Sequence, residues 1–374
     1  MNKLRIGSVA IICFVILVLT TVSFAQSRRV PPPTPTPTPG DDEPVRVPTE
    51  EIKLNVLAFD EHGKFVGDVR AEDVVITENN ILNQAISMRR IPANVLIAMD
   101  TGGEMRQVKS LDQTRRTARA LVDALRPGDS VALLQYADTA QIAAEWTTDK
   151  SEISRAIGRT DFGRRSDFVG ALELARDFLM KNPADNRHLV LITDGTDSTA
   201  GTAEKAAAVR DLLTTDISVH VISYTRMEAA DLEPRTKIVS NSPPPRAMPP
   251  EVAAQLPNGA RDVATTPKAK TINLDRTLLR RLKARKSDLE SSELQLQTLA
   301  ENSNGTVIIP ETTDEMVEKT ALVAKMIDSS YVLTYVPKIP LNEKTGERNI
   351  EVTSKRDGLI VQARRKLIVE PEVR

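Results

Sequence analysis

The chain has 374 residues, of which 40% are hydrophobic and 27% are charged, and its 50 basic residues nearly balance its 51 acidic residues. This length can bury the core of one large domain and a smaller companion, and the balanced charge gives no electrostatic basis for nucleic-acid binding. The single cysteine, Cys13, lies in an N-terminal apolar run. Disulfides, zinc–thiolate sites and cysteine catalysis are therefore excluded for the rest of the chain.

Residues 1–25 have the layout of a secretory signal peptide. Lys3 and Arg5 precede the apolar run at 6–22, and small residues at positions 23 and 25 suit cleavage before Gln26. The alternative is an uncleaved membrane anchor, because the run is close to the shortest length that spans a bilayer. We therefore expect an exported protein, periplasmic or secreted, that contacts the membrane only through this segment.

A Pro/Thr-rich linker follows at 26–48. Three prolines begin at Pro31, and threonine and proline then alternate up to Pro39. Such a sequence favours the extended polyproline II conformation and cannot bury a core. It predicts a semi-rigid spacer between the N-terminus and the folded part of the chain.

Two segments of alternating hydrophobicity predict β structure on either side of a central region. In the N-terminal β segment, 49–92, apolar and polar residues alternate from Ile52 onward, and Asn79–Asn80 marks a turn. The C-terminal β segment, 331–374, begins at Tyr331 with a similar strand pattern. We expect the strands of both segments to pair into one small β module, with the central region inserted between them.

The central region, 93–330, alternates between strand-like and helix-like patterns, as a mostly parallel sheet requires. The pattern at 130–146 predicts a hairpin that adds one antiparallel edge strand. The predicted class is thus α/β, with a doubly wound, mostly parallel sheet. The predicted strands are 94–99, 130–135, 140–146, 188–193, 217–224 and 306–309, and the predicted helices are 108–126, 150–158, 168–181, 203–214, 288–302 and 313–329.

Between residues 226 and 287 this alternation breaks. Proline-rich runs such as Ser242–Pro245 predict a poorly ordered insertion. Near its end, the segment 278–286 is rich in arginine and lysine and predicts a basic helix. Two interpretations stay open for this helix: a solvated face, or a surface that docks on an acidic partner or a membrane.

Two strands of the central region end on an aspartate. The strand at 94–99 leads into Asp100, two glycines and Glu104, and the strand at 188–193 leads into Asp194. In open α/β sheets, ligands bind in the crevice beyond the carboxyl ends of the strands. Two aspartates at that edge can share one hard cation, because such cations prefer oxygen ligands.

This pattern resembles the von Willebrand factor type A domain, whose metal-ion-dependent adhesion site begins with D-x-S-x-S after the first strand. The resemblance implies the fold of that domain and a protein-binding function. With the flanking β segments, it extends to a family of exported bacterial proteins best known from acidobacteria. It places Asp100 at the first metal ligand, Ser166 at the family's threonine and Asp194 at the last aspartate. The two serine positions hold Gly102 and Glu104 instead.

These departures leave two interpretations of the site. In the first, one divalent cation is bound, and Ca²⁺ suits the irregular oxygen shell better than Mg²⁺. Its ligands would be Asp100, Glu104, Ser166 and Asp194. In the second, no metal is bound and a nearby arginine offsets the carboxylates. The candidates for that arginine are Arg106, Arg164 and Arg165.

The sequence also bears on activity. It contains no G-x-S-x-G motif, no glycine-rich phosphate loop and no histidine beside a candidate nucleophile. We therefore expect no enzymatic activity, and no cofactor beyond the divalent cation of the first interpretation. The expected function is an exported, adhesion-type protein-interaction module with a degenerate adhesion site and a protein partner at the cell envelope. The alternative is a metal-independent structural component of the envelope that makes contact through 278–286.

Overall fold

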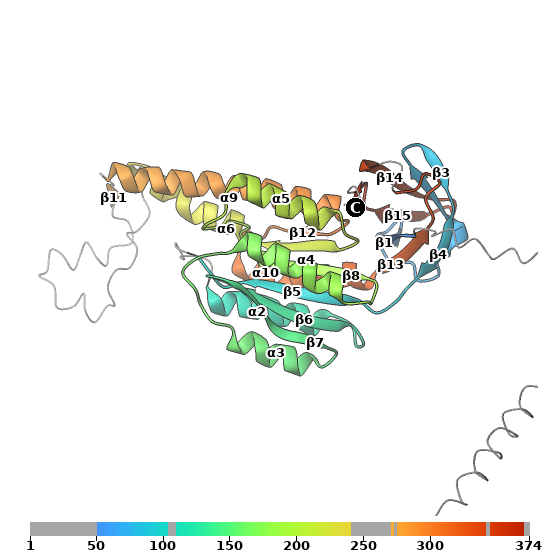
Figure 1. The fold of residues 1–374 in the computed structure, drawn as a ribbon. Coiled ribbons are helices and arrows are strands. Elements are labelled where there is room, and N and C mark those ends of the chain that lie inside the picture. The colour runs from blue at the N-terminus through green and yellow to red at the C-terminus, as the bar shows by residue number, and fades with distance from the viewer. Residues whose placement is uncertain (1–50, 104–109, 241–270, 273–274, 342–344, 370–374) are drawn as a thin grey trace, which may run out of the picture. The chain divides into compact units, whose positions relative to one another are not determined.

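The computed structural model describes residues 51–103, 110–240, 271–272, 275–341 and 345–369 (Figure 1). The predicted signal peptide and the Pro/Thr-rich linker lie outside these residues. The chain from Thr49 to Arg374 forms one compact unit. Within the described residues, no helix combines the length and the hydrophobicity that a membrane crossing requires.

The central sheet has six strands in the order β12-β9-β8-β5-β6-β7. Neighbouring strands are parallel except for β7, which pairs antiparallel with β6, so the predicted hairpin and the predicted α/β class are confirmed. Every residue of β5, β8 and β9 is buried, as expected for parallel strands covered on both faces. The bounds are β5 (Asn94–Asp100), β6 (Ser130–Tyr136), β7 (Ala140–Thr147), β8 (Arg187–Thr193), β9 (Ser218–Ser223) and β12 (Val307–Ile308).

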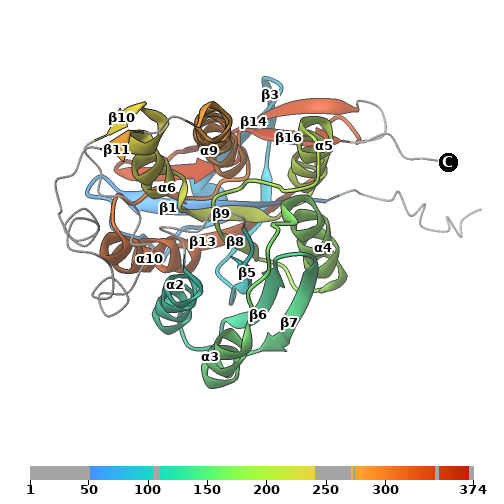
Figure 2. The same cartoon turned by 90° about the vertical axis from the view of Figure 1, so that its left-hand side faces the viewer.

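Helices cover both faces of this sheet (Figure 2). One face packs against α2 (Leu111–Ala124), α3 (Lys150–Arg159) and α10 (Thr313–Asp328). The other face packs against α4 (Phe168–Lys181), α5 (Thr202–Leu213) and the second half of α9 (Arg276–Asn302). Polar caps fix where several helices begin. The Asp167 side chain, for example, accepts a hydrogen bond from the backbone of Gly170 and so starts α4 directly after Ser166.

The predicted insertion is largely helical where it is described. It contains α6 (Thr225–Leu232), the short 3-10 helix η2 (Glu233–Thr236), the strand pair β10 (Val239–Ser240) and β11 (Thr271–Ile272), and the start of α9 (Arg276–Asn302). The prediction of a poorly ordered insertion was therefore wrong for these residues, and 241–270 lie outside the described residues. The basic helix and the helix predicted at 288–302 are one continuous helix, α9. Its continuity follows from packing, because Leu282 and Leu289 form a buried cluster with Leu232 of α6.

Strands from both chain ends form two antiparallel sheets around a shared core. Their orders are β15-β1-β13-β4 and β16-β14-β2-β3. The short 3-10 helix η1 (Ala71–Asp73) leads into β2. The central domain is inserted between β4 and β13, so the flanking β strands of the predicted class are present. Their bounds are β1 (Ile52–Asp60), β2 (Val74–Glu78), β3 (Ile81–Asn83), β4 (Ala85–Arg89), β13 (Ser330–Tyr335), β14 (Gly346–Ser354), β15 (Leu359–Ala363) and β16 (Lys366–Val369).

This β module bonds to the amino ends of the parallel strands. Asn55 of β1 donates to the Ser218 hydroxyl at the start of β9, over 3.0 Å. Arg364, which follows β15, donates to the carbonyl of Ile217, just before β9. The β module therefore occupies one end of the sheet, and the candidate crevice lies at the opposite, carboxyl end.

Candidate functional site at the carboxyl ends of the strands

Asp100 and Ser166, two of the predicted site residues, lie together at the end of β5. The Asp100 side chain is fully buried. Its Oδ1 accepts a hydrogen bond from the backbone of Gly102 at 3.0 Å. Its Oδ2 accepts from the Ser166 hydroxyl at 3.3 Å and from the Thr193 hydroxyl at 3.4 Å. Two residues that the resemblance assigns to one site, Asp100 and Ser166, thus lie together in the structure. The contact of Thr193, the last residue of β8, was not foreseen.

A buried hydroxyl chain continues from Thr193. The phenol of Tyr136 donates to the Thr193 hydroxyl at 2.6 Å, and the backbone of Gly195 donates to the same oxygen at 2.7 Å. Burial, followed by the negative charge of Asp100, raises the pKa of Tyr136 well above its ordinary value. Tyr136 therefore stays protonated, and as a hydrogen-bond donor it links the end of β6 to the end of β8.

Asp194 points toward a different group of residues. Its Oδ1 accepts from the backbone of Thr196 at 2.8 Å and from the Thr196 hydroxyl at 2.6 Å. Its Oδ2 accepts from Nη2 of Arg285 at 2.9 Å. Arg285 lies on α9, inside the basic run that the sequence singles out at 278–286. Each Asp194 carboxylate oxygen therefore has a donor from the described residues.

Arg285 bridges three side chains at the mouth of the site. Besides Asp194, its Nη2 donates to Oε2 of Glu228 on α6 at 3.0 Å, and its Nη1 donates to the Thr196 hydroxyl at 2.7 Å. Burial alone would lower the pKa of Arg285, but the charges of Asp194 and Glu228 outweigh it and raise the pKa above its ordinary value. The guanidinium is thus a permanent cation held between two carboxylates.

The sequence-based candidates for this cation were different. Arg164 and Arg165 are exposed, and among the described residues neither forms an ion pair with the site carboxylates. Arg106 and Glu104 lie outside the described residues. The compensating charge that the structure shows therefore comes from Arg285, which the sequence analysis had placed on a solvated or docking face. The only available signal was the basic run itself, and nothing local distinguishes its third arginine from its neighbours.

Steric crowding explains why position 102 holds glycine rather than the serine of the family's motif. A Cβ atom built on Gly102 would lie 1.7 Å from the carbonyl oxygen of Arg165 and 2.9 Å from the Cα of Ala137. A serine hydroxyl of the adhesion-site motif therefore cannot occupy this position unless the loop moves. One oxygen ligand of the family's site is absent for this reason.

The described residues fit a hard divalent cation poorly. They contain no group of three or more His, Cys, Asp or Glu side chains that could hold a metal ion. Such a cation needs six or more oxygen ligands, whereas one Asp194 oxygen is bonded to a guanidinium and Gly102 offers no side chain. Because Glu104 is not described, the four-ligand metal site remains a prediction.

A second loop contact holds the site in shape. The backbone of Val169 donates to Oδ2 of Asp197 at 2.9 Å, and the Ser166 and Ser198 segments exchange two hydrogen bonds. Burial would raise the pKa of Asp197, but backbone donors from Ala200, Val169 and Thr199 outweigh it and lower the pKa. The loop after β8 is therefore tied to the start of α4, which positions Ser166 near Asp100.

Several solved structures are similar to this chain at low sequence identity. No curated protein matches the chain. An aerotolerance-related membrane protein from Bacteroides fragilis is similar at 17% identity and a TM-score of 0.39, covering 63% of this chain and 98% of that one. BatB from Bacteroides thetaiotaomicron is similar at 17% identity and a TM-score of 0.36, with the same coverage. A von Willebrand factor type A protein from Catenulispora acidiphila is similar at 11% identity and a TM-score of 0.40, covering 87% of this chain and 74% of that one.

The family comparison covers the strands and loops that build the crevice. Residues 95–196 match the model of the von Willebrand factor type A domain. This range begins in β5 and ends just beyond Asp194, so it includes Asp100 and Ser166. The central domain, with its six-stranded sheet between two helical layers, is thus similar to the von Willebrand factor type A domain over residues 95–196.

Proposed function

We propose that this chain is an exported, non-enzymatic protein-interaction module whose type A crevice works without a metal ion. The interaction role is supported by the type A domain, a fold used for protein binding. Export is supported by the signal-peptide pattern at 1–25. The metal-independent part depends on one observation, the ion pairs of Arg285.

The guanidinium of Arg285 takes the electrostatic role that a cation has in an adhesion site. It contacts Asp194, the last ligand of the family's motif, and it also neutralises Glu228. Only 22% of the Arg285 side chain is exposed. A divalent cation that coordinated Asp194 would have to displace a guanidinium with three hydrogen-bonded partners, and removing one member of such a buried pair is unfavourable by several kcal/mol.

A calorimetric titration with Mg²⁺, Mn²⁺ and Ca²⁺ tests this part of the proposal. We expect no saturable binding to the wild-type chain at millimolar ion concentration. Saturable binding that disappears in Asp100→Ala would overturn the metal-independent crevice and restore the four-ligand interpretation.

A stability measurement tests the role of Arg285. Arg285→Met leaves the Asp194 and Glu228 carboxylates without their shared cation, so the free energy of unfolding should fall by about 2 kcal/mol. Arg281→Met, an exposed position on the same helix, is the matched control and should change it by less than about 0.5 kcal/mol. Equal effects in the two variants would show that Arg285 is not a structural cation.

The interaction role has its own test at the rim of the crevice. A photoreactive amino acid at Arg164, an exposed residue two positions before Ser166, should give a crosslinked protein adduct on intact cells, with and without excess chelator. The same group at Glu318, an exposed position on α10, is the control and should give no such adduct. A chelator-sensitive adduct would contradict the metal-independent mechanism, and adducts of equal yield at both positions would argue against a specific interaction at the crevice.

One observation favours the alternative, a structural envelope component. Arg280, Arg281 and Lys283 are exposed on α9, in contrast to Arg285. These side chains form a basic face that could contact an acidic surface. Reversing the three charges should abolish retention in the envelope fraction if this alternative holds, and should leave it unchanged if the crevice makes the contact.

A further inference from the structure

The central sheet ends on a short strand with an open outer edge. Only Val307 and Ile308 of β12 pair with β9, although β9 is six residues long. The backbone of Val221 donates to the carbonyl of Thr306 at 2.8 Å, so the Thr306 backbone faces β9. Because backbone groups alternate along a strand, those of Val307 face outward. Among the described residues, no strand pairs with that side.

The edge is held firmly enough to act as a template. The backbone of Thr306 donates to Nδ1 of His220 on β9 at 3.2 Å. A Cβ atom on Gly305 would lie 1.7 Å from the carbonyl oxygen of Val219, so glycine allows the chain to enter β12 close against β9. Helices α9 and α10 both contact β12, one from each face of the sheet. As far as the described residues reach, only the edge of β12 is left open.

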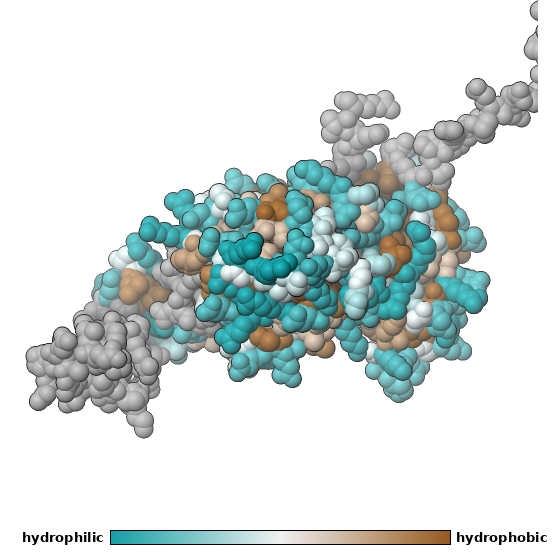
Figure 3. Space-filling model, turned by 90° about the horizontal axis from the view of Figure 1, so that it is seen from below, coloured by the Kyte–Doolittle hydropathy of each residue, from teal (hydrophilic) through white to brown (hydrophobic). Residues whose placement is uncertain are grey.

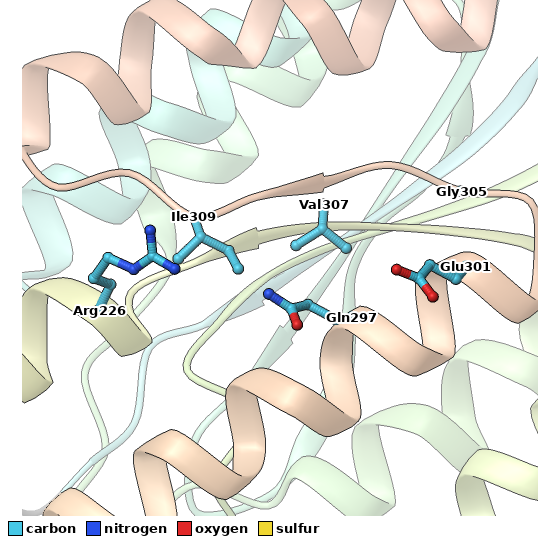
Figure 4. A pocket seen from close by; sticks show the side chains of 6 residues that line it. All are labelled: Arg226, Gln297, Glu301, Gly305, Val307 and Ile309. Atoms are coloured by element: carbon cyan, nitrogen blue, oxygen red, sulfur yellow. The ribbon is translucent and has the colours of Figure 1, made fainter.

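A pocket of about 460 Å³ opens at this edge, between β12 and α9 (Figure 4). The side chains of Val307 in β12 and of Ile309 just after it point toward the pocket, and Gln297 of α9 faces them. Glu301 lies at one end of the pocket and Arg226 lies at the other. The pocket thus has an apolar side on the strand and opposite charges at its two ends.

Other surfaces offer less. Figure 3 shows that the face seen from below is mainly hydrophilic, with hydrophobic residues in separate spots rather than in one continuous area. A second pocket, between α5 and α9, is lined by the exposed Leu294 and by Val209 and Leu213. Nothing in the structure indicates what would cover it. The β12 edge differs because its backbone groups and its charges together specify the occupant.

We propose that the β12 edge binds an extended segment of a protein partner, which adds to the sheet as a further strand. An apolar side chain of this segment packs on Val307 and Ile309. An acidic residue meets Arg226 and a basic residue meets Glu301. Backbone hydrogen bonds supply the affinity in this mode of recognition, and the side chains supply the specificity. The proposal concerns a surface apart from the type A crevice and does not depend on it.

The charged side chains at the two ends of the pocket, Arg226 and Glu301, can still form ion pairs with a bound segment. The Arg226 side chain is 48% exposed and donates through Nη2 to Glu293 at 3.0 Å. A guanidinium carries five N–H donors, so Arg226 can donate hydrogen bonds to a second carboxylate as well. Glu301 is exposed at the C-terminal end of α9. Because β12 is short, we expect weak binding, with a dissociation constant on the order of 100 µM.

Fluorescence polarisation with two labelled peptides and the full chain tests the proposal. Both peptides alternate valine and threonine over about seven residues, the length of an ordinary strand. One carries glutamate at its N-terminal end and lysine at its C-terminal end, and the other has these ends exchanged. One of the two should bind better, because a strand prefers one direction beside β12. N-methylation of alternate backbone amides in that peptide should weaken binding by about tenfold, since it removes the edge hydrogen bonds.

Charge reversal provides the second readout. In the double variant Arg226→Glu/Glu301→Lys the preference between the two peptides should invert, which misfolding cannot produce. Arg210→Glu/Glu318→Lys makes the same charge changes at exposed positions on α5 and α10 and should leave the preference unchanged. The proposal is overturned if neither peptide binds the wild-type chain at about 1 mM, or if neither N-methylation nor charge reversal alters binding. Self-association of the chain that the peptide disrupts would also overturn it, and would assign the edge to a second copy.

Discussion

The two ends of the central sheet each hold a buried or half-buried arginine, and the two arginines have different surroundings. At the carboxyl end, Arg285 faces the carboxylates of Asp194 and Glu228 and remains partly exposed. At the amino end, Arg364 is 3% exposed and donates to the backbone carbonyls of Thr215 and Ile217. Burial lowers the pKa of Arg364 to about 10, whereas two carboxylates raise the pKa of Arg285.

This difference separates a junction from a binding surface. Two neutral carbonyls accept hydrogen bonds from Arg364, and the charge of Asp216 does not outweigh the effect of burial on its pKa. Its geometry therefore depends on the packing of the β module against the domain. The Arg285 cluster is compensated by charge and its guanidinium is partly exposed, so a binding partner can contact it while its ion pairs stay in place. We therefore expect mutations at the amino end to affect stability most, and mutations at the carboxyl end to affect recognition.

The buried histidines His188 and His220, also near the amino end of the sheet, connect β8 and β9 to the start of β13. The backbone of Thr306 donates to Nδ1 of His220, so neutral His220 must carry its proton on Nε2 and donate to Nδ1 of His188 at 3.0 Å. His188 then donates through Nε2 to Asn186 at 2.8 Å. The Ser330 hydroxyl, at the start of β13, donates to the same Asn186 oxygen. Protonating His220 would place its Nδ1–H against the backbone N–H of Thr306. Protonating His188 would place its Nδ1–H against the Nε2–H of His220.

The largest effect is expected at Arg364. Arg364→Met removes two charge-assisted hydrogen bonds and leaves two buried carbonyls without their donor, so the free energy of unfolding should fall by about 4 kcal/mol. Urea denaturation measures this change. The neighbouring Arg365 is exposed, and Arg365→Met is the matched control. If both variants unfold at the same urea concentration, the junction is not held by Arg364 and the contrast between the two ends fails.

The histidine pair should make the chain sensitive to acid. Burial lowers the pKa of His220 from 6.5 to about 4 and lowers that of His188 well below 6.5. Between these values the unfolded chain binds protons that the folded chain does not, so stability is present above pH 6.5 and is lost as the pH falls toward 4. Each histidine should contribute a loss of about 1.4 kcal/mol per pH unit.

Urea denaturation across this pH range, compared between variants, isolates the histidine contribution. His220→Gln should reduce the slope of stability against pH. His62→Gln, at the exposed third histidine, should leave the slope at the wild-type value. An unchanged slope in His220→Gln would mean that the buried pair does not titrate as described.

A smaller effect is expected at the carboxyl end, from Gly102→Ser. This change supplies the hydroxyl of the family's motif, but its Cβ would collide with the carbonyl of Arg165, so stability should fall by about 2 kcal/mol. Calorimetry should detect no gain in divalent-cation binding. Gly201→Ser, at the N-cap of α5 where serine is favourable, is the control and should be neutral or slightly stabilising. Tight metal binding by Gly102→Ser would show that the loop can adapt and that the missing hydroxyl alone disables the site.

Much of the fold could be predicted because its signals are local. The strand predicted at 94–99 is β5, and the helix predicted at 168–181 has the bounds of α4. The periodicity of buried residues and the capping aspartate are contained within each segment, so no knowledge of the partner element was needed. The prediction was wrong for the described part of the insertion because Leu282 and Leu289 are ordered by packing on α6, a contact that a proline-rich and basic composition does not indicate.

The sequence by itself determined that one strand ends on Asp100 and that Asp194 directly follows another, because a strand's length and its flanking residues are local properties. Parallel strands then bring these ends to one edge of the sheet. Only the tertiary structure decided which cation faces Asp194. Arg285 lies 91 positions away, and it reaches the site because α9 docks on α6 through apolar contacts that do not involve its charge. The sequence determines the charge of a side chain such as Arg285, but the packing of the helix that carries it determines which carboxylate it pairs with.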